Sequence, residues 1–227
     1  GRLGLNKLIV IYDNNDITLD GPLALSNYDN TKMRFEACGW NVLTTDGTSV
    51  DLMKKMILKA KKSHKPTLII AKTTIGKGSI NEGTAKVHGA PIGEDDAVQL
   101  KEKLGWNYEK FEIPQDVYDH FENTFVKRGN KAFRNWRKNA KIYEFRYPNE
   151  WAEFTKAVKG DYEGLEYPEF EVGTKEATRV SSGKVINYVA DQIPTFLGGS
   201  ADVASSVQTK IKHESTFDKD NYIGKNV

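Results

Sequence analysis

Oxygen-bearing side chains follow the first apolar segment of the chain. Residues 8–12 form an unbroken apolar run rich in β-branched residues, and Asp13, Asn14 and Asn15 come directly after it. Amide and backbone carbonyl oxygens are hard ligands suited to Mg²⁺ or Ca²⁺, and Mg²⁺ usually takes few protein ligands beside phosphate oxygens. The same residue types also close strands as Asx turns. The segment therefore indicates either a divalent-metal site or a structural turn.

A second candidate is the segment 72–78, which contains two lysines and two glycines. Such a loop can hold a phosphate, but the spacing of a Walker P-loop is absent, and the glycines can equally serve a tight turn. His88 lies in the loop that follows. A neutral imidazole there can donate a hydrogen bond to a phosphate or transfer a proton, although a histidine in a loop is more often only solvated.

A third candidate lies near the end of the sequence. Arg179 falls at the start of a predicted helix, and a glycine-rich stretch leads into residues 202–206. A guanidinium group can bind a phosphate through two parallel hydrogen bonds, and a helix N-terminus adds its dipole. The plain alternative for Arg179 is a solvated surface arginine.

The elements that must position these residues alternate between strand and helix. Apolar runs predict strands, and amphipathic patterns predict helices, at residues 8–12, 31–38, 40–44, 48–64 and 67–73. This order requires parallel strands joined by right-handed crossovers, so the carboxyl ends of all three strands lie at one edge of the sheet. Open parallel sheets bind ligands at that edge. The sequence therefore predicts an α/β fold, a parallel sheet flanked by helices, with the candidate loops brought together.

Local patterns add detail to the first half of the chain. The continuous run at residues 8–12 predicts a strand that is buried on both faces. Thr48 and Asp51 resemble a capping box at the start of the helix at 48–64, and Val50 is expected on its buried face.

The second half is predicted to be largely helical. Gly129-Asn130 is expected to interrupt the helical pattern, and residues 159–175 have the composition of an interdomain linker. A strand is expected at residues 196–202. The expected helices span residues 93–104, 116–127, 131–145, 151–158 and 176–190.

Composition excludes several classes of protein. The chain has 227 residues, a net charge of +2, 11% aromatic residues and a single cysteine, Cys38. One cysteine cannot form an intrachain disulfide, and a near-neutral chain is not a bulk-charge binder of polyanions or membranes. No apolar run approaches the ~20 residues that a membrane span needs. We therefore expect a cytoplasmic protein with no membrane partner.

One segment of the chain is strongly basic. Residues 127–146 contain eight basic residues and one acid, with aromatic residues between them. This pattern occurs in nucleic-acid-binding proteins. The near-neutral total charge favours a solvated helix face instead, with Phe133, Trp136, Ala140 and Tyr143 packed inward. We expect no nucleic acid partner.

Taken together and in order, these segments resemble transketolase, a thiamine-diphosphate enzyme family. The matching stretches are Lys7 to Gly21, Met33 to Trp40, Lys72 to Ser79, His88 to Gly93, Leu104 to Trp106, Ala177 to Arg179 and Phe196 to Asp202. Each stretch is short, but their combination covers nearly the whole chain. The resemblance implies ketol transfer between sugar phosphates by a homodimer that uses thiamine diphosphate and Mg²⁺ or Ca²⁺.

The resemblance also implies roles at the cofactor. Asn15 would give a side-chain oxygen to the metal ion, and Ile17 would give its backbone carbonyl. Leu19 and Ile75 would pack against the thiazolium ring. His88, the catalytic candidate, would reach both the cofactor diphosphate and the substrate.

Three further residues have implied roles toward the substrate and the dimer. Arg179 and Ser206 would bind the sugar phosphate, beside His88. Asp202 would face the cofactor that is bound across the dimer interface.

The sequence also departs from the family pattern. The Gly-Asp-Gly motif with the other metal ligand, the upstream substrate histidines and the downstream catalytic Glu are absent, and Ala85 stands where many members have a second histidine. The chain is therefore expected to be an internal fragment and to be inactive alone. Its expected parts are the diphosphate-binding domain at 1–158, the linker at 159–175 and an incomplete pyrimidine-binding domain at 176–227. The alternatives are a non-catalytic scaffold or partner-binding fragment, and a related ketolase such as dihydroxyacetone synthase.

Overall fold

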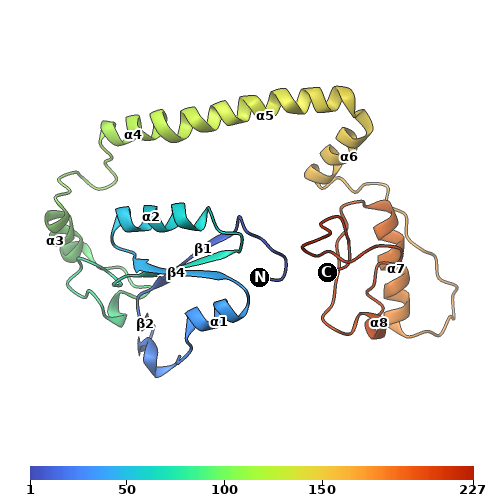
Figure 1. Ribbon diagram of the computed structural model, residues 1–227, viewed down its shortest axis with the longest axis horizontal. Helices are drawn as coiled ribbons and strands as arrows, with labels where there is room; N and C mark the ends of the chain where they lie inside the picture. Colours follow the sequence, from blue (N-terminus) through green and yellow to red (C-terminus); the bar gives the residue numbers. More distant parts are fainter. The chain divides into compact units, whose positions relative to one another are not determined.

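The computed structural model describes residues 1–227, which form two compact units, Gly1–Glu109 and Lys110–Val227. The first unit contains a three-stranded sheet of β1 (Ile9–Asn14), β5 (Thr67–Lys72) and β4 (Asn41–Asp46), in that spatial order. Both pairings are parallel (Figure 1). The predicted parallel sheet and its strand–helix alternation are confirmed.

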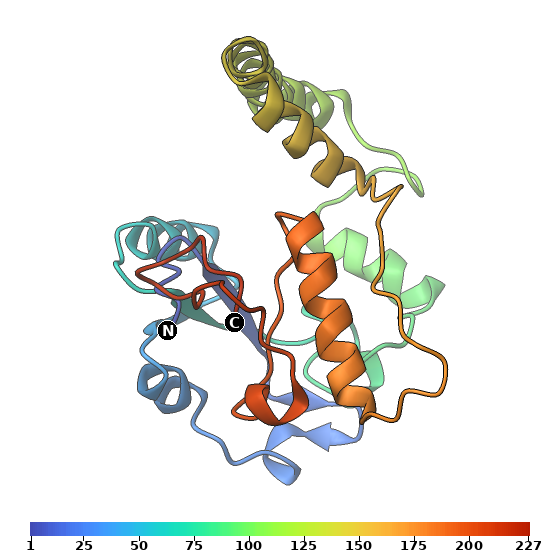
Figure 2. The ribbon, with the colours of Figure 1, turned by 90° about the vertical axis from the view of Figure 1, so that its right-hand side faces the viewer.

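Two helices cover this sheet on opposite faces. Figures 1 and 2 show α1 (Thr31–Ala37) on one side and α2 (Val50–Ala60) on the other. The core consists of Leu43, Ala60 and Ile69, against which Ile9, Met53, Met56 and Ile57 pack. β5 is the most buried strand because it has a hydrogen-bonded neighbour on each side.

Three local predictions for this unit are wrong. β1 is not buried on both faces, since Ile11 is 50% exposed, because β1 is an edge strand here and β5 is the central one. The cap of α2 is Ser49, whose hydroxyl accepts a hydrogen bond from the Leu52 N–H. Thr48 instead donates to Asp46, and Val50 is 81% exposed.

Short elements connect the sheet to the rest of the unit. A two-stranded antiparallel hairpin of β2 (Ile17–Thr18) and β3 (Gly21–Pro22) follows β1, with the short helix η1 (Leu23–Leu25) after it. The chain leaves β5 through a long loop that contains the 3-10 turn η2 (Ala85–Val87) and ends in helix α3 (Glu94–Leu104). These connections carry most of the candidate site residues.

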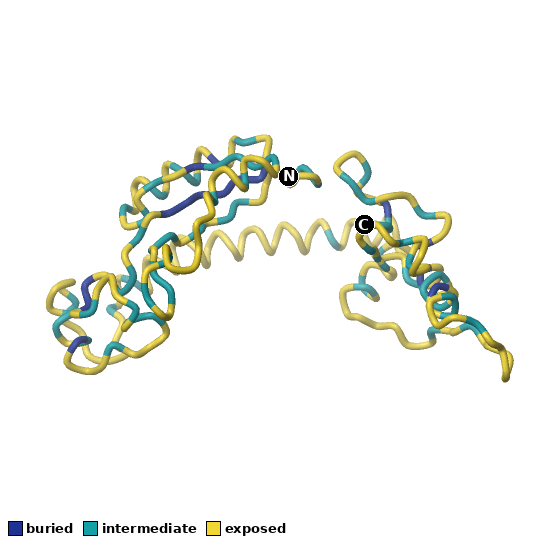
Figure 3. Tube along the Cα trace, turned by 90° about the horizontal axis from the view of Figure 1, so that it is seen from below, coloured by how far each residue is buried: buried dark blue, intermediate teal, exposed yellow.

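The second unit is helical. Its elements are α4 (Gln115–Phe121), the π-helical turn η3 (Glu122–Val126), α5 (Lys127–Arg146), α6 (Pro148–Lys159), α7 (Thr178–Gln192) and α8 (Ala204–Val207). Figure 3 shows that α5 is exposed along nearly its whole length. No helix in residues 1–227 is both long and apolar enough to cross a membrane.

Two predictions for this unit are also wrong. The helix is not interrupted at Gly129-Asn130, because α5 runs through both residues and the irregular turn lies before it, in η3. The strand expected at 196–202 is absent, and only an isolated bridge joins Gly198 to Asn226. Glycines at 198 and 199 offer no side chains to pack, and no second strand extends the pairing.

Apart from Lys159, which ends α6, the predicted linker contains no helix or strand, and it is held along α7. The backbone N–H of Glu166 donates to Oε1 of Gln192, and Nε2 of Gln192 donates back to the Glu166 carbonyl, both at 2.9 Å. The ammonium group of Lys184 lies over the ring of Phe170. Figure 2 shows this segment beside α7.

Candidate functional site

The turn after β1 holds the two predicted metal ligands. Oδ1 of Asn15 accepts a hydrogen bond of 3.1 Å from the Ile17 N–H, which is an Asx turn. Asp16, between them, has a left-handed backbone with φ of 59°. An amide oxygen has two lone pairs, so the turn leaves one lone pair of Asn15 for a cation. The same geometry of Asn15 can therefore serve both as a structural turn and as a metal ligand.

The ends of β1 and β5 are tied together at the carboxyl edge of the sheet. The Thr73 N–H donates to the Asn14 carbonyl at 3.2 Å, and the Thr73 hydroxyl donates to the Asp13 carboxylate. An exposed ion pair joins Lys72 to Asp16. The structure thus brings the two candidate loops after β1 and β5 to the same edge, as the topology predicts.

The end of β4 lies at the same edge. Gly47 donates its N–H to the Lys72 carbonyl at 2.8 Å, and an added Cβ there would lie 2.7 Å from the Thr73 methyl group. Hydrogen bonds from the Thr48 hydroxyl and N–H keep the pKa of Asp46 below its ordinary value, with a smaller contribution from the charge of Lys77. All three strand ends are therefore in close contact.

Ile75 and His88 belong to one loop system after β5. Gly76, next to Ile75, has φ of +60°, and an added Cβ would lie 2.6 Å from a methyl group of Val87. The Gly83 N–H donates to the Ile75 carbonyl at 2.9 Å. His88 follows Val87 directly, and its Nδ1 is buried without a hydrogen-bond partner. The glycine therefore lets the chain fold Ile75 close to the turn that carries His88.

Leu19 lies in the hairpin loop between β2 and β3, in the segment that follows Asn15 and Ile17. Its side chain is 66% exposed, so it is available for contact with a bound group.

Asp96 is a residue whose position the sequence did not reveal. The helix expected at residues 93–104 places it only in a first helical turn, but its side chain is buried. Hydrogen bonds from the Ser79 hydroxyl, and then from the Ile80 N–H and Gln99, hold the pKa of this carboxyl below its ordinary value despite burial. Asp96 precedes Leu100 by four residues, which places the two on one helix face. This spacing from an apolar residue was the signal in the sequence that Asp96 could lie on the buried face of the helix.

The remaining candidates lie in the second unit. Arg179 is in the first turn of α7, Ser206 is in α8, and Asp202 precedes α8; all three are exposed. The two helices approach closely, since an added Cβ at Gly183 would lie 2.7 Å from the Gln208 carbonyl oxygen.

A cavity of about 340 Å³ lies between α7 and α8. Its lining includes Lys184, Lys210 and Lys212, and also Val180 and Ser205, the sequence neighbours of two candidates, but neither Arg179 nor Ser206.

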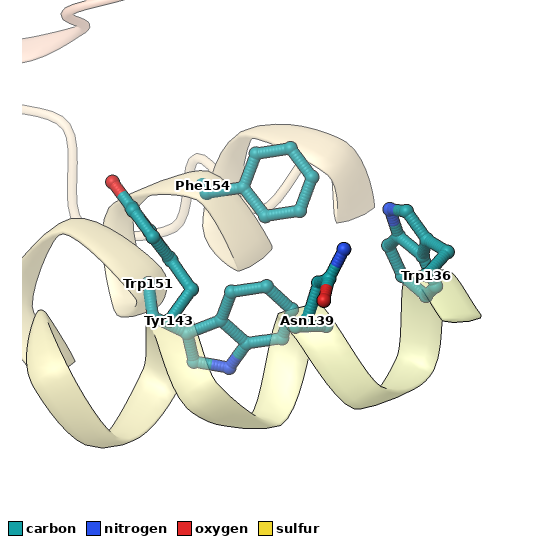
Figure 4. Close-up of a pocket in the computed structure, with 6 residues that line it drawn as sticks. Trp136, Asn139, Tyr143, Trp151 and Phe154 are labelled. Carbon is teal, nitrogen blue, oxygen red and sulfur yellow. The ribbon is translucent and has the colours of Figure 1, made fainter. Parts of the chain in front are cut away.

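The aromatic and basic residues of α5 separate onto different faces. Trp136 and Tyr143 line a cavity of about 400 Å³ together with Trp151 and Phe154 of α6 (Figure 4). A separate surface hollow is lined by Arg134, Arg137, Lys138 and Lys141. The inward packing predicted for Phe133, Trp136 and Tyr143 is wrong, since these side chains are 56%, 53% and 43% exposed, because α5 has only α6 and the turn before it to pack against. Of the four predicted residues, Ala140 is half-buried.

Comparison with known proteins identifies the family. The model of the transketolase thiamine diphosphate binding domain matches residues 1–163. The transketolases of Bacillus subtilis and Geobacillus stearothermophilus are each 43% identical to this chain, over 233 and 234 residues, and the matches cover 100% of it. They cover only 35% of each relative, so the chain spans about a third of the length of these relatives.

Solved structures agree with this assignment. The transketolase of Leishmania mexicana matches 99% of this chain and 34% of its own, with a TM-score of 0.89 and 32% identity. The transketolase of Campylobacter jejuni matches 99% of this chain and 34% of its own, with a TM-score of 0.83 and 37% identity. Because the family model covers well over half of its residues, this chain belongs to the transketolase family.

Proposed function

We propose that this chain forms part of the cofactor site of a transketolase. The intact protein would transfer a two-carbon ketol unit from a ketose phosphate to an aldose phosphate. The observation that carries the proposal is the buried, unpaired Nδ1 of His88 beside the glycine loop after β5. A buried polar atom without a partner costs free energy, and a diphosphate oxygen is an acceptor to which a protonated Nδ1 can donate.

Thiamine diphosphate, when bound, supplies the electron sink that ketol transfer needs. In this proposal His88 holds the diphosphate and contacts the substrate, while Ile75 and Leu19 offer apolar surface to the thiazolium ring. The exposed side chain of Leu19 and the close approach of Gly76 to Val87 support this arrangement.

The metal ion of the proposal is Mg²⁺ or Ca²⁺. The second lone pair of Asn15 and the backbone carbonyl of Ile17 would supply two oxygen ligands, and both ions prefer oxygen. Residues 1–227 contain no group of three or more His, Cys, Asp or Glu side chains that could hold a metal. The remaining ligands of the proposal would include oxygens of the diphosphate and water.

The second unit would serve the substrate. Arg179 and Ser206 would bind the sugar phosphate, and Asp202 would face the cofactor across the interface of a homodimer. The domains would be residues 1–158, with 159–175 as linker and 176–227 as the start of the pyrimidine-binding domain. We place the protein in the cytoplasm.

Cofactor titration of the intact protein tests the central claim. We expect His88→Ala and Asn15→Ala each to raise the dissociation constant of thiamine diphosphate at limiting Mg²⁺ by about tenfold or more, since each loses a hydrogen bond or ligand to a charged group. Unchanged affinity in both variants would refute the assigned roles. Cofactor binding without turnover of xylulose-5-phosphate and ribose-5-phosphate would favour the non-catalytic alternative.

Arg179→Ala tests the phosphate contact. Loss of one charge-assisted hydrogen bond, about 1.5–3 kcal/mol, corresponds to roughly ten- to a hundredfold weaker binding. We expect KM to rise by that factor for ribose-5-phosphate, and to change little for glycolaldehyde, which has no phosphate. Equal losses for both acceptors would mean that Arg179 supports the fold or the dimer.

A further inference from the structure

One face of α3 holds the loop that follows β5. Asp96 is 5% exposed, and its carboxylate accepts hydrogen bonds from the Ser79 hydroxyl and from the Ile80 N–H, the latter at 3.0 Å. Nε2 of Gln99 donates to the same carboxylate at 2.6 Å. A buried carboxylate is stable only with such a set of donors, so its three partners are fixed in position.

The same helix face also engages Gly78. Nε2 of Gln99 donates to the Gly78 carbonyl at 3.0 Å, and the Gly78 N–H donates to Oε2 of Glu82 at 2.7 Å. Gly78 has φ of +94°, and an added Cβ would clash with Leu100. Both polar groups of this glycine are therefore paired with side chains, and its backbone lies against the helix.

The loop that α3 holds lies between two residues of the proposed cofactor site. Ile75 comes just before Gly76, and Gly76 packs against Val87, the residue before His88. A shift of the loop from Gly76 to Ile80 would therefore move Ile75 directly and His88 through Val87. Asp96 is too far along the chain to be part of either turn, and it acts only through this loop.

We infer that Asp96 is a positioning residue, which with Ser79 and Gln99 fixes the loop that sets Ile75 and His88 toward the cofactor. The part of the inference that concerns the cofactor rests on the proposed function. The part that concerns the loop rests only on the hydrogen bonds and burial described above.

Hydrogen exchange of the 227-residue chain tests the loop. Asp96→Asn replaces charge-assisted hydrogen bonds by neutral ones, and Ser79→Ala removes one of them. We expect exchange in peptides covering residues 76–88 to rise by roughly 5- to 30-fold in both variants, with peptides of β5 unchanged. Asp95→Asn is the matched control, because it removes the same charge from the same helix turn at an exposed position. Unchanged exchange in both variants, or an equal rise in β5, would overturn the inference.

Titration of the intact protein with thiamine diphosphate tests whether Asp96 positions Ile75 and His88 toward the cofactor. We expect Asp96→Asn to raise the dissociation constant of the cofactor by several fold, and Asp95→Asn to leave it unchanged. At saturating cofactor, Asp96→Asn should also raise KM for xylulose-5-phosphate, because His88 contacts the substrate in the proposed function, whereas a general loss of folding would lower the maximal rate and leave KM unchanged. A wild-type protein that binds no cofactor would refute the proposed function, while exchange would still decide on the loop. Wild-type binding with unchanged affinity in Asp96→Asn would overturn the positioning role.

Discussion

The central strand of the first unit, β5, and the long helix of the second, α5, differ in how far their residues are buried. β5 has five consecutive buried residues, whereas none of the 20 residues of α5 is buried. β5 has a strand on each side and packs against α2, while α5 packs mainly against α6 and the π-helical turn before it. Burial therefore depends on how many neighbours an element has, and apolar composition alone does not determine it.

The largest difference in stability between the two regions is expected when one large apolar side chain is truncated in each. Ile69 is fully buried in β5, and Ile69→Ala should lower the free energy of unfolding of the first unit by about 2–5 kcal/mol. Phe145 in α5 is 88% exposed. Phe145→Ala should therefore change the free energy of unfolding of the second unit by no more than about 0.5 kcal/mol. Urea denaturation followed by circular dichroism measures both. Similar losses in the two variants would contradict the comparison.

A smaller effect is expected where α5 does have a neighbour. Trp151 of α6 packs at ring-centroid distances of 6.4 Å from Tyr143 and 5.4 Å from Phe154. Because the indole is only partly buried, Trp151→Ala should cost about 1–2 kcal/mol and loosen α6 from α5. The near-ultraviolet circular dichroism of the aromatic cluster should weaken while the β5 core persists. Val158→Ala, at a position 70% exposed on α6, serves as control and should leave the spectrum unchanged.

The smallest effect is expected from mild acid. The pKa of Asp96 in the folded chain lies below its ordinary value, chiefly because the Ser79 hydroxyl donates to it. Its contribution to stability is therefore complete above about pH 4, the pKa range of an unfolded aspartate, and is lost as the pH falls through the folded pKa. Protection factors of the Gly78 and Ile80 amides should be constant from pH 5 to 8 and fall below about pH 4. Asp96→Asn should abolish that dependence; if it persists, other groups cause it.

Much of the fold was predictable because its signals are local. The apolar runs at β1, β4 and β5 and the helical patterns between them require parallel strands, and the structure has them. The predictions that failed depended on partners distant in sequence. Whether β1 is an edge strand, whether Gly198 has a strand to pair with and whether Gly129 can remain in a helix are decided by surrounding packing.

For the candidate site, too, local features were predictable and contacts between distant residues were not. The sequence predicts Asn15, Ile75 and His88 as candidates and predicts that their loops share one edge of the sheet. It could not predict that Ile17 uses one lone pair of Asn15, or that Nδ1 of His88 is buried without a partner. Nor could it predict the role of Asp96, because its donors Ser79 and Ile80 lie 17 and 16 residues away.

The sequence by itself determined the order and type of the elements, the parallel sheet and the family, because periodicity and chain order are properties of neighbouring residues. Only the tertiary structure decided which strand is central, which helix stays exposed, and that the carboxylate of Asp96 is buried against the loop after β5. The physical reason is that burial, and with it the strength of hydrogen bonds and the pKa of a carboxyl, depends on atoms that only folding brings together.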